Sequence, residues 1–283
     1  EVKVFDAAFS SIEDLKTSIV NFQPDYIGVG LRNIDNVTMR KCKWYLNDIK
    51  SKIIEPIRQT SMVPLIIGGS VFSIAPEQIF DFLDVDYGVI GEAENILPKL
   101  IEQLEKGNDL NLKNVISKKT GAVSVERENT GLLDLPKANV DLLIDFKPYN
   151  EKGSYPVQTK RGCAHKCIYC SYPTIEGKNY RLRAVSEIVD EIEEVQQRIP
   201  DVTIEFVDST FNSPLNHALK ICREIIRRDL KVKLRTMGVN PGEVTEELLI
   251  AMKDAGFAQI DCTPDSASES MIKNYRKNFT LSK

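Results

Sequence analysis

The sequence lacks most of the features that mark secreted, membrane-spanning and nucleic-acid-binding proteins. Its 283 residues include only six cysteines, which do not have the regular spacing of a disulfide framework. No apolar run approaches the roughly 18 residues that span a membrane, and the opening EVKVFDAAF has no basic segment followed by an apolar one, as a secretory signal would. The formal net charge of −4 gives no basic footprint for nucleic acid. These absences predict a cytoplasmic protein without a membrane span or a nucleic-acid partner.

Length and composition predict a globular protein with two ordinary domains or one large α/β unit. The chain is 42% apolar and 28% charged, which is usual for a folded domain. Its first residues, EVKVFD, alternate like a strand, and no initiator methionine precedes them. We therefore expect the chain to be a fragment, with a preceding strand and helix outside the given sequence.

Residues 1–105 alternate between strand-like and helix-like segments. Strands are expected at 2–6, 26–31, 64–69 and 86–91, and helices at 11–22, 36–59, 76–83 and 93–106. Strands rich in Ile and Val with helices between them predict a parallel sheet that is covered on both faces. Ligands of such sheets bind beyond the carboxyl ends of the strands. The sequence there reads Gly30-Leu31-Arg32, Gly68-Gly69-Ser70 and Gly91-Glu92.

The glycines at these strand ends have two possible explanations. They let a large flat or phosphorylated ligand approach the backbone closely, or they form tight turns, and composition alone leaves both open. After these units, residues 106–150 lose the alternation. Two short runs around Lys119-Thr120-Gly121 predict a hairpin, and Pro136, Pro148 and Gly153 predict a linker between domains.

The alternation returns over residues 151–283. Strands are expected at 156–161, 202–207, 231–236 and 257–262, and helices near 186–198, 214–228, 244–255 and 266–275. Ser186 is expected to cap the first of these helices, and Gly256 to end the third. Sequential βα units predict a barrel or partial barrel, with its chemistry at the carboxyl ends of the strands.

Three of the six cysteines, Cys163, Cys167 and Cys170, lie just after the first strand of this second domain. Thiolates are soft ligands that suit zinc or an iron–sulfur cluster. One alternative is a zinc site completed by His165, but a closed tetrahedron within so short a loop would be strained. The other alternative is a chance group of structural thiols without a metal. The spacing favours a cluster in which one iron has no protein ligand.

The remaining cysteines and a histidine are expected to be structural, with one exception. Cys42 and Cys222 lie in helical patterns and are expected to be small core residues. Trp44 lies in the same predicted helix as Cys42. His217 is expected at the surface of its helix or partly buried there, while Cys262 ends a strand on the reactive rim, where a functional role stays open.

The motif CAHKCIYC, with Tyr169 in its aromatic position, is similar to the Cys-x-x-x-Cys-x-aromatic-Cys signature of the radical S-adenosylmethionine (radical SAM) superfamily. EFVDSTFN at 205–212 and LLIAMKDAGFAQIDCTPDSAS at 248–268 resemble later parts of these enzymes, with Asp265-Ser266 in place of the usual Glu-Ser pair. PDYIGVGLRN, PLIIGGSVFS and DYGVIGEAEN resemble the cobalamin-binding domain that precedes many of them. The Asp-x-His-x-x-Gly loop of some cobalamin proteins is not in the given sequence.

The resemblance implies an α/β fold in three parts. A Rossmann-like cobalamin-binding-type domain at 1–105, with its first strand missing, is followed by a linker with a hairpin at 106–150 and a partial (β/α) radical SAM barrel at 151–283. Three thiolates, from Cys163, Cys167 and Cys170, would hold a 4Fe-4S cluster and leave the fourth iron for S-adenosylmethionine.

The resemblance also implies the ligand-binding residues and the reaction. The residues implied for S-adenosylmethionine are Tyr169, Asp208, Ser209, Arg235 and Ser266, and those implied for cobalamin are Leu31, Arg32, Gly68, Gly69, Ser70, Gly91 and Glu92. The implied reaction is radical methylation of an unactivated carbon. The alternatives are a cyclisation or rearrangement, with or without cobalamin, and a structural or sensory metal-binding protein. The implied partners are a small-molecule, natural-product or lipid-precursor substrate and an electron donor of the flavodoxin or ferredoxin type.

Overall fold

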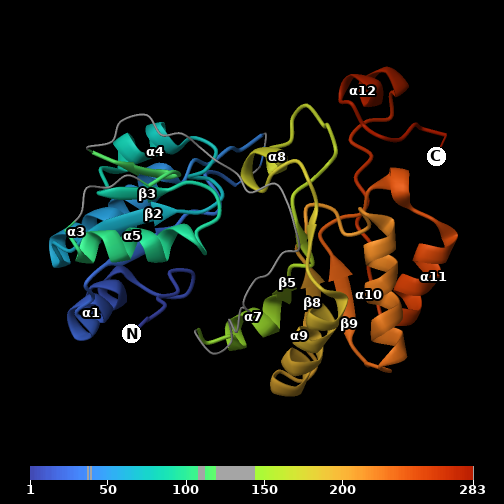
Figure 1. Ribbon diagram of the computed structural model, residues 1–283, viewed down its shortest axis with the longest axis horizontal. Helices are drawn as coiled ribbons and strands as arrows, with labels where there is room; N and C mark the ends of the chain where they lie inside the picture. The colour runs from blue at the N-terminus through green and yellow to red at the C-terminus, as the bar shows by residue number, and fades with distance from the viewer. Residues whose placement is uncertain (37, 39, 108–111, 119–143, 283) are drawn as a thin grey trace. The chain divides into compact units, whose positions relative to one another are not determined.

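The chain consists of two compact units, Glu1–Arg127 and Glu128–Lys283 (Figure 1). The computed structural model describes residues 1–36, 38, 40–107, 112–118 and 144–282. The hairpin expected around residues 119–121 lies outside the described residues. Among the helices within them, none combines the length and the apolar character that crossing a bilayer requires.

The first unit is a four-stranded sheet in the order β1-β2-β3-β4. The strands β1 (Ile27–Gly30), β2 (Leu65–Gly68) and β3 (Tyr87–Val89) are parallel, and β4 (Val115–Ser117) pairs antiparallel with β3. The helices are α1 (Ile12–Phe22), α2 (Leu46–Ile49), the π-helical segment η1 (Lys50–Ile54), α3 (Glu55–Thr60), α4 (Pro76–Leu83) and α5 (Ile96–Glu105). The expected parallel α/β arrangement is present, and β4 extends the sheet beyond residue 105.

The strand β2 shows why helices cover both faces of this sheet. Leu65 and Ile67 are fully buried in a cluster formed with α1, α3 and α4. Ile66, between them, is buried in a second cluster with Leu100 of α5. Because successive side chains of a strand point to opposite faces, a continuous apolar run fills two cores at once.

The predictions of two elements in this unit are wrong. Residues 2–6 form no strand, because an alternating segment also needs a neighbouring strand for its backbone hydrogen bonds and has none among the described residues. The helix expected from residue 36 begins at Leu46 instead. Trp44 therefore lies outside the helix and is 59% exposed.

The side chain of Asn36 explains why the chain turns where a helix was expected. Its amide nitrogen donates to the carbonyl of Lys41 (2.9 Å), and its amide oxygen accepts from the backbone N–H of Lys43 (3.0 Å). Asparagine often competes with helical hydrogen bonds in this way. Cys42 lies within this turn and is exposed, so the expectation of a core residue is wrong.

The second unit has a parallel sheet, β5-β8-β9, and a separate antiparallel ribbon, β6-β7. The strands are β5 (Tyr155–Val157), β6 (Lys160–Arg161), β7 (Arg181–Leu182), β8 (Thr203–Phe206) and β9 (Lys233–Thr236). The helices are α7 (Lys147–Lys152), α8 (Tyr172–Ile175), α9 (Val185–Arg198), α10 (Leu215–Arg227), the 3-10 segment η2 (Pro241–Glu243), α11 (Glu246–Ala255) and α12 (Glu269–Asn274).

Three details of this unit differ from expectation. The strand expected at 156–161 is divided between β5 and β6, and the strand expected at 257–262 is reduced to two isolated parallel bridges, Leu234–Phe257 and Val239–Cys262. The helix α9 begins at Val185, so Ser186 lies inside it. Gly256 does end α11, in the left-handed region at φ 105°.

The sheet β5-β8-β9 has one buried face and one polar face. Alternate residues such as Ile204 and Phe206 are fully buried in a core with α9, α10 and α11, and α10 contacts both neighbouring helices (Figure 1). The intervening residues, among them Glu205 and Arg235, are only partly buried. The polar side chains and the loops after these strands therefore stay available for a site.

Candidate functional site

The cysteine loop, residues 162–171, begins at a glycine that no other residue can replace without strain. Gly162 has φ 86°, and a Cβ atom there would lie 2.0 Å from the carbonyl oxygen of Asn179. The Gly162 N–H donates to Glu176 Oε2 (3.1 Å), and the Cys163 N–H donates to the carbonyl of Gly177 (3.1 Å). The start of the loop is thus fixed against residues 176–179.

The middle of the cysteine loop is held by residues around α12. The Ile168 N–H donates to the carbonyl of Tyr275 (3.2 Å), and the Tyr169 hydroxyl donates to Asp265 Oδ1 (2.9 Å). Lys277 Nζ contacts both the Tyr169 hydroxyl and the Asp265 carboxylate. Burial by itself lowers the pKa of Lys277, but its hydrogen bonds to Asp265 and Tyr169 raise that pKa above the usual range. A lysine cation therefore lies beside the cysteine loop.

The three thiols of the loop are free and near one another. Cys163 is buried, and Cys167 and Cys170 are half-buried. Burial raises the pKa of Cys170, and the thiols of Cys163 and Cys167 raise it further. Within the described ranges, no three His, Cys, Asp or Glu side chains are arranged to hold a single metal ion. A zinc ion needs each thiolate within about 2.3 Å of one centre, whereas a cluster offers each thiolate a different iron.

His165 takes part in a hydrogen-bond network through its Nε2 atom. Its Nε2 atom accepts from Asn240 Nδ2 (2.8 Å) and shares a hydrogen bond with Ser213 Oγ (3.1 Å). Burial lowers the pKa of His165, and Glu243, 3.8 Å away, offsets this only in part. The neutral ring thus ties the cysteine loop to the segments after β8 and β9. Soft thiols without a histidine partner fit an iron–sulfur cluster better than a Cys3His zinc site.

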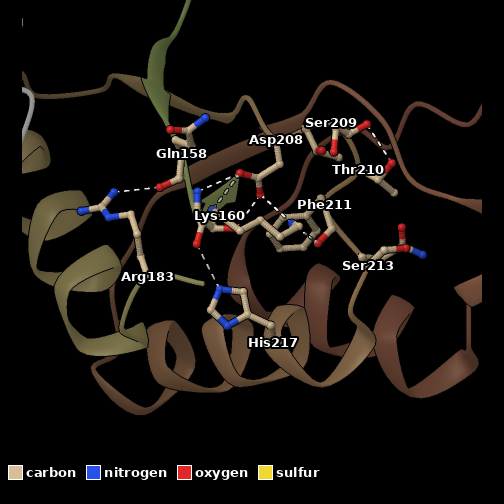
Figure 2. Close-up of polar contacts among 12 residues, drawn as sticks. Gln158, Lys160, Arg183, Asp208, Ser209, Thr210, Phe211, Ser213 and His217 are labelled. Atoms are coloured by element: carbon tan, nitrogen blue, oxygen red, sulfur yellow. Dashed lines mark hydrogen bonds and ion pairs between the residues drawn. The ribbon is translucent and has the colours of Figure 1, made fainter. Parts of the chain in front are cut away.

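Asp208, predicted to bind S-adenosylmethionine, has a fully buried side chain that is paired with Lys160 (Figure 2). Its Oδ1 atom accepts from the backbone N–H groups of Thr159 (2.8 Å) and Lys160 (3.3 Å). Its Oδ2 atom accepts from Thr159 Oγ1 (2.5 Å) and Lys160 Nζ (2.9 Å). The ligand role of Asp208 stays a prediction, and these contacts compete with it.

The other residues predicted to bind S-adenosylmethionine differ in whether their side chains already have partners within the protein. The Ser209 hydroxyl is buried and has no hydrogen-bond partner within the described part of the chain. Arg235 is paired with Glu205, which lies directly opposite it on β8 (3.0 Å). Ser266 Oγ accepts from the backbone N–H of Ser268 (3.1 Å). Ser209 is therefore the group best prepared to accept a ligand.

Sequence reasoning missed the roles of Lys160 and His217. Lys160 is 1% exposed, and nothing in the local pattern predicts that a lysine is buried there. His217 is 6% exposed, so the expectation that it lies at the helix surface or only partly buried is wrong. Its Nε2 atom donates to the carbonyl of Thr159 (3.2 Å). A signal for His217 does exist, because Ile221 and Ile225 follow it at the spacing of one helix face.

Most of the residues predicted for cobalamin lie together at the carboxyl ends of β1 and β2, and Gly91 and Glu92 follow β3. The Leu31 N–H donates to the carbonyl of Gly68 (2.8 Å), and the Ser70 hydroxyl donates to the carbonyl of Arg32 (3.1 Å). Gly69 has φ 99°, and a Cβ atom there would lie 2.5 Å from the carbonyl oxygen of Leu31. The missing side chain of Gly69 is thus required by the protein's own backbone.

A serine outside the predicted set connects the third strand end to this group. The Ser73 hydroxyl donates to the carbonyl of Gly69 (2.9 Å) and accepts from the backbone N–H of Gly91 (2.8 Å), which precedes Glu92. A Cβ atom at Gly30 or Gly91 would meet no atom within 4 Å. The backbone is therefore open to a ligand at both glycines, which fits a large flat cofactor.

Comparison with known proteins relates the second unit to a known family. Residues 157–282 match the family model of the radical SAM superfamily. Tryptophan 2-C-methyltransferase of Streptomyces laurentii is 24% identical, over 98% of this chain and 56% of its own length. Hopanoid C-3 methylase of Methylococcus capsulatus is also 24% identical, over 100% of this chain and 53% of its own length. The chain thus spans about half the length of these relatives.

A solved structure shares the fold of nearly the whole chain. TsrM from Kitasatospora setae, a radical S-adenosylmethionine methyltransferase with cobalamin and a [4Fe-4S] cluster bound, superposes with a TM-score of 0.80 at 22% identity. The match covers 95% of this chain and 54% of TsrM. Residues 157–282, which carry the cysteine loop, match the family model of the radical SAM superfamily, and the solved structure shows that nearly the whole chain shares its fold.

Proposed function

We propose that the chain is the cofactor-binding part of a radical SAM enzyme that methylates an unactivated carbon of a small molecule. The observation that carries this proposal is the cysteine loop. Its three free thiols lie in a radical SAM domain, beyond the carboxyl end of β5, on backbone that is fixed at Gly162 and Ile168. Chemistry in βα folds is concentrated at this end of the strands.

We propose that Cys163, Cys167 and Cys170 hold a 4Fe-4S cluster and that the second unit binds S-adenosylmethionine. When bound, the cluster supplies the electron that cleaves S-adenosylmethionine. The chain contributes position and charge: Lys277 lies beside the loop as a cation and offsets the negative charge of the thiolates. Ser209 offers a buried hydroxyl to the ligand, and the ligand would also meet the backbone of Tyr169.

Two further residues are proposed to bind S-adenosylmethionine, and each would first have to give up a contact within the protein. Arg235 would have to exchange its ion pair with Glu205 for the carboxylate or ribose of the ligand. Ser266 would have to release the backbone of Ser268. Each exchange takes a contact away from Glu205 or from the Ser268 N–H, but neither residue is buried, so water can replace that contact.

We propose that the first unit is a Rossmann-like domain that binds cobalamin, which carries the methyl group. Support comes from the parallel sheet with helices on both faces and from the open backbone at Gly30 and Gly91. The proposed contacts with the cofactor come from the three strand ends: Leu31, Arg32, Gly68, Gly69, Ser70, Gly91 and Glu92. The substrate is proposed to be a small organic molecule, and the electron donor a flavodoxin or ferredoxin.

The experiment is anaerobic reconstitution of the chain with iron, sulfide and cobalamin, followed by addition of S-adenosylmethionine and a strong reductant. We expect both 5′-deoxyadenosine and S-adenosylhomocysteine, the first reporting radical formation and the second methyl transfer. Replacing Cys163, Cys167 or Cys170 by Ala abolishes the first product, while Cys42→Ser, at an exposed turn, leaves it unchanged. Normal 5′-deoxyadenosine formation in any of the three alanine variants would refute the assignment. Failure to bind stoichiometric cobalamin would refute methyl transfer through it.

A further inference from the structure

Lys160, three residues before Cys163, forms a completely buried ion pair with Asp208 (Figure 2). Their side chains are 1% and 0% exposed, and Lys160 Nζ lies 2.9 Å from Asp208 Oδ2. The same ammonium group also donates to the carbonyl of Phe211 (3.2 Å). The pair therefore joins the strand that leads into Gly162 to the loop that follows β8.

The hydrogen-bonding capacity of Asp208 is already filled. Each of its two oxygens accepts two hydrogen bonds, all four of them from Thr159 and Lys160. An ionised carboxylate has about four lone-pair sites in total. A ligand ammonium group could bind Asp208 only by displacing one of these donors into a buried space, where an unpaired polar group is unfavourable.

The backbone next to the pair is also fully engaged. The carbonyl of Gln158 accepts from Arg183 Nη1 (2.7 Å), and the carbonyl of Thr159 accepts from the Arg183 N–H (3.0 Å) and from His217. Arg183 in turn is paired with Glu191 at 2.7 Å, with both side chains almost completely buried. Residues 158–160 thus form a fixed strap from which the cysteine loop departs.

A buried ion pair is an unusual way to gain stability. Well-packed apolar side chains in its place are often as stable or more so, because two charges must leave water. What the pair gives is a defined geometry, since Lys160 must satisfy Asp208 and Phe211 at once. This points to a role in placing the loop.

We propose that Lys160 and Asp208 are positioning residues for the cysteine loop, and that Ser209 rather than Asp208 presents its side chain to S-adenosylmethionine. This inference rests on the proposed function and assigns the residues within that site. Asp208 acts through Thr159 and Lys160 on the backbone three residues before Cys163, whereas the adjacent Ser209 keeps a buried hydroxyl free for the ligand.

The first test uses the cofactor-free chain and follows thiol alkylation by mass spectrometry. Lys160→Met or Asp208→Asn loosens the strap, so Cys163, 6% exposed, reacts with N-ethylmaleimide at least tenfold faster. Cys222, which is fully buried in α10, serves as the internal control, because global unfolding would expose it as well. The double variant leaves no unpaired charge. Its Cys163 is therefore alkylated more slowly than the two single effects added together predict.

The matched control for these variants is a surface ion pair in the same unit. Arg223 and Glu247 are paired with both side chains 61% exposed, and Arg223→Met leaves the alkylation of Cys163 and Cys222 unchanged. Three results would overturn the positioning role. The single variants could leave the alkylation rate of Cys163 unchanged, they could accelerate alkylation of Cys222 equally, or the double variant could show strictly additive effects.

The second test separates Ser209 from Asp208 by electron paramagnetic resonance of the reconstituted, reduced protein. The measured quantity is the S-adenosylmethionine concentration that gives half of the maximal change in the cluster signal. Ser209→Ala raises this concentration about fivefold, as expected for one lost hydrogen bond. In the cluster-loaded fraction, Asp208→Asn changes that concentration no more than Lys160→Met does. Loss of the response in Asp208→Asn alone would show that Asp208 binds the ligand. If the unaltered protein gives no response, the proposed function fails, and the alkylation test still decides the positioning role.

Discussion

Replacing Gly162 by alanine should distort the cysteine loop at its first residue. The residue has φ 86°, and the left-handed region costs a residue with a side chain about 1–2 kcal/mol. The new Cβ would also lie 2.0 Å from the carbonyl oxygen of Asn179, where ordinary contact begins near 3.4 Å. The carbonyl must therefore move by more than an ångström, and such overpacking costs about 1–3 kcal/mol. We expect a total loss of about 2–5 kcal/mol in the free energy of unfolding.

Two other glycines of the same unit provide the controls. Gly256 has φ 105°, and its added Cβ would lie 2.3 Å from the carbonyl oxygen of Val232, so Gly256→Ala should lose a similar amount of stability away from the loop. Gly238 has no positive φ, and its Cβ would lie 3.9 Å from the nearest carbonyl oxygen, that of Asp261, so Gly238→Ala should change stability little.

The assay combines urea unfolding of the cofactor-free chain with iron and sulfide analysis after reconstitution. Gly162→Ala lowers both the unfolding midpoint and the iron bound per folded chain, whereas Gly256→Ala lowers only the midpoint. If Gly162→Ala unfolds like the parent and binds a full cluster, the close contact with Asn179 is wrong. If Gly256→Ala loses as much iron, loading reports global stability and not loop geometry.

Three further predictions concern buried groups. Burial lowers the pKa of His217, so the folded chain stays unprotonated where the unfolded chain binds a proton; stability is complete above the ordinary value of about 6.5 and is lost as the pH falls below it, by up to about 1.4 kcal/mol per pH unit. His217→Gln should flatten this slope in urea unfolding between pH 7 and pH 5, and an unchanged slope would contradict the assignment. Arg183→Met leaves Glu191 buried without its cation and should lower the free energy of unfolding by about 3–5 kcal/mol, while adding Glu191→Leu should recover most of the loss; no recovery would show that the pair is not coupled. Burial raises the pKa of Cys222 to about 12, so N-ethylmaleimide should modify the exposed Cys42 of the native chain and reach Cys222 only in denaturant, as peptide mass spectrometry would show.

The parts of the fold that follow from local pattern could be predicted from sequence. The run from Leu65 to Gly68 is short, rich in Ile and flanked by Pro64 and Gly69, which is typical of a strand buried on both sides. Gly256 ends its helix because few other residues adopt its conformation. The helix expected from residue 36 failed because periodicity carries no information on a side chain such as Asn36, which bonds to the backbone of a turn.

In the candidate site, too, local features could be predicted from the sequence and long-range contacts could not. The spacing of Cys163, Cys167 and Cys170 is a local property, and it predicted the loop. The surroundings of Asp208 depend on Lys160, 48 residues away in sequence, and no local pattern reports such a partner. The role predicted for Asp208 was therefore transferred without knowledge of the donors that fill its carboxylate.

The two-sided character of the sheet β5-β8-β9 has an evolutionary consequence. Ile204 and Phe206 are locked into the core by three helices, so their replacement would require compensating changes in several elements. Thr203 and Glu205, which alternate with them along the strand, can be exchanged without disturbing that packing. Selection can thus rewrite one surface of each strand while the other is inherited unchanged. A scaffold of this kind can keep one architecture while most of its sequence changes, as the fold shared with TsrM at 22% identity shows.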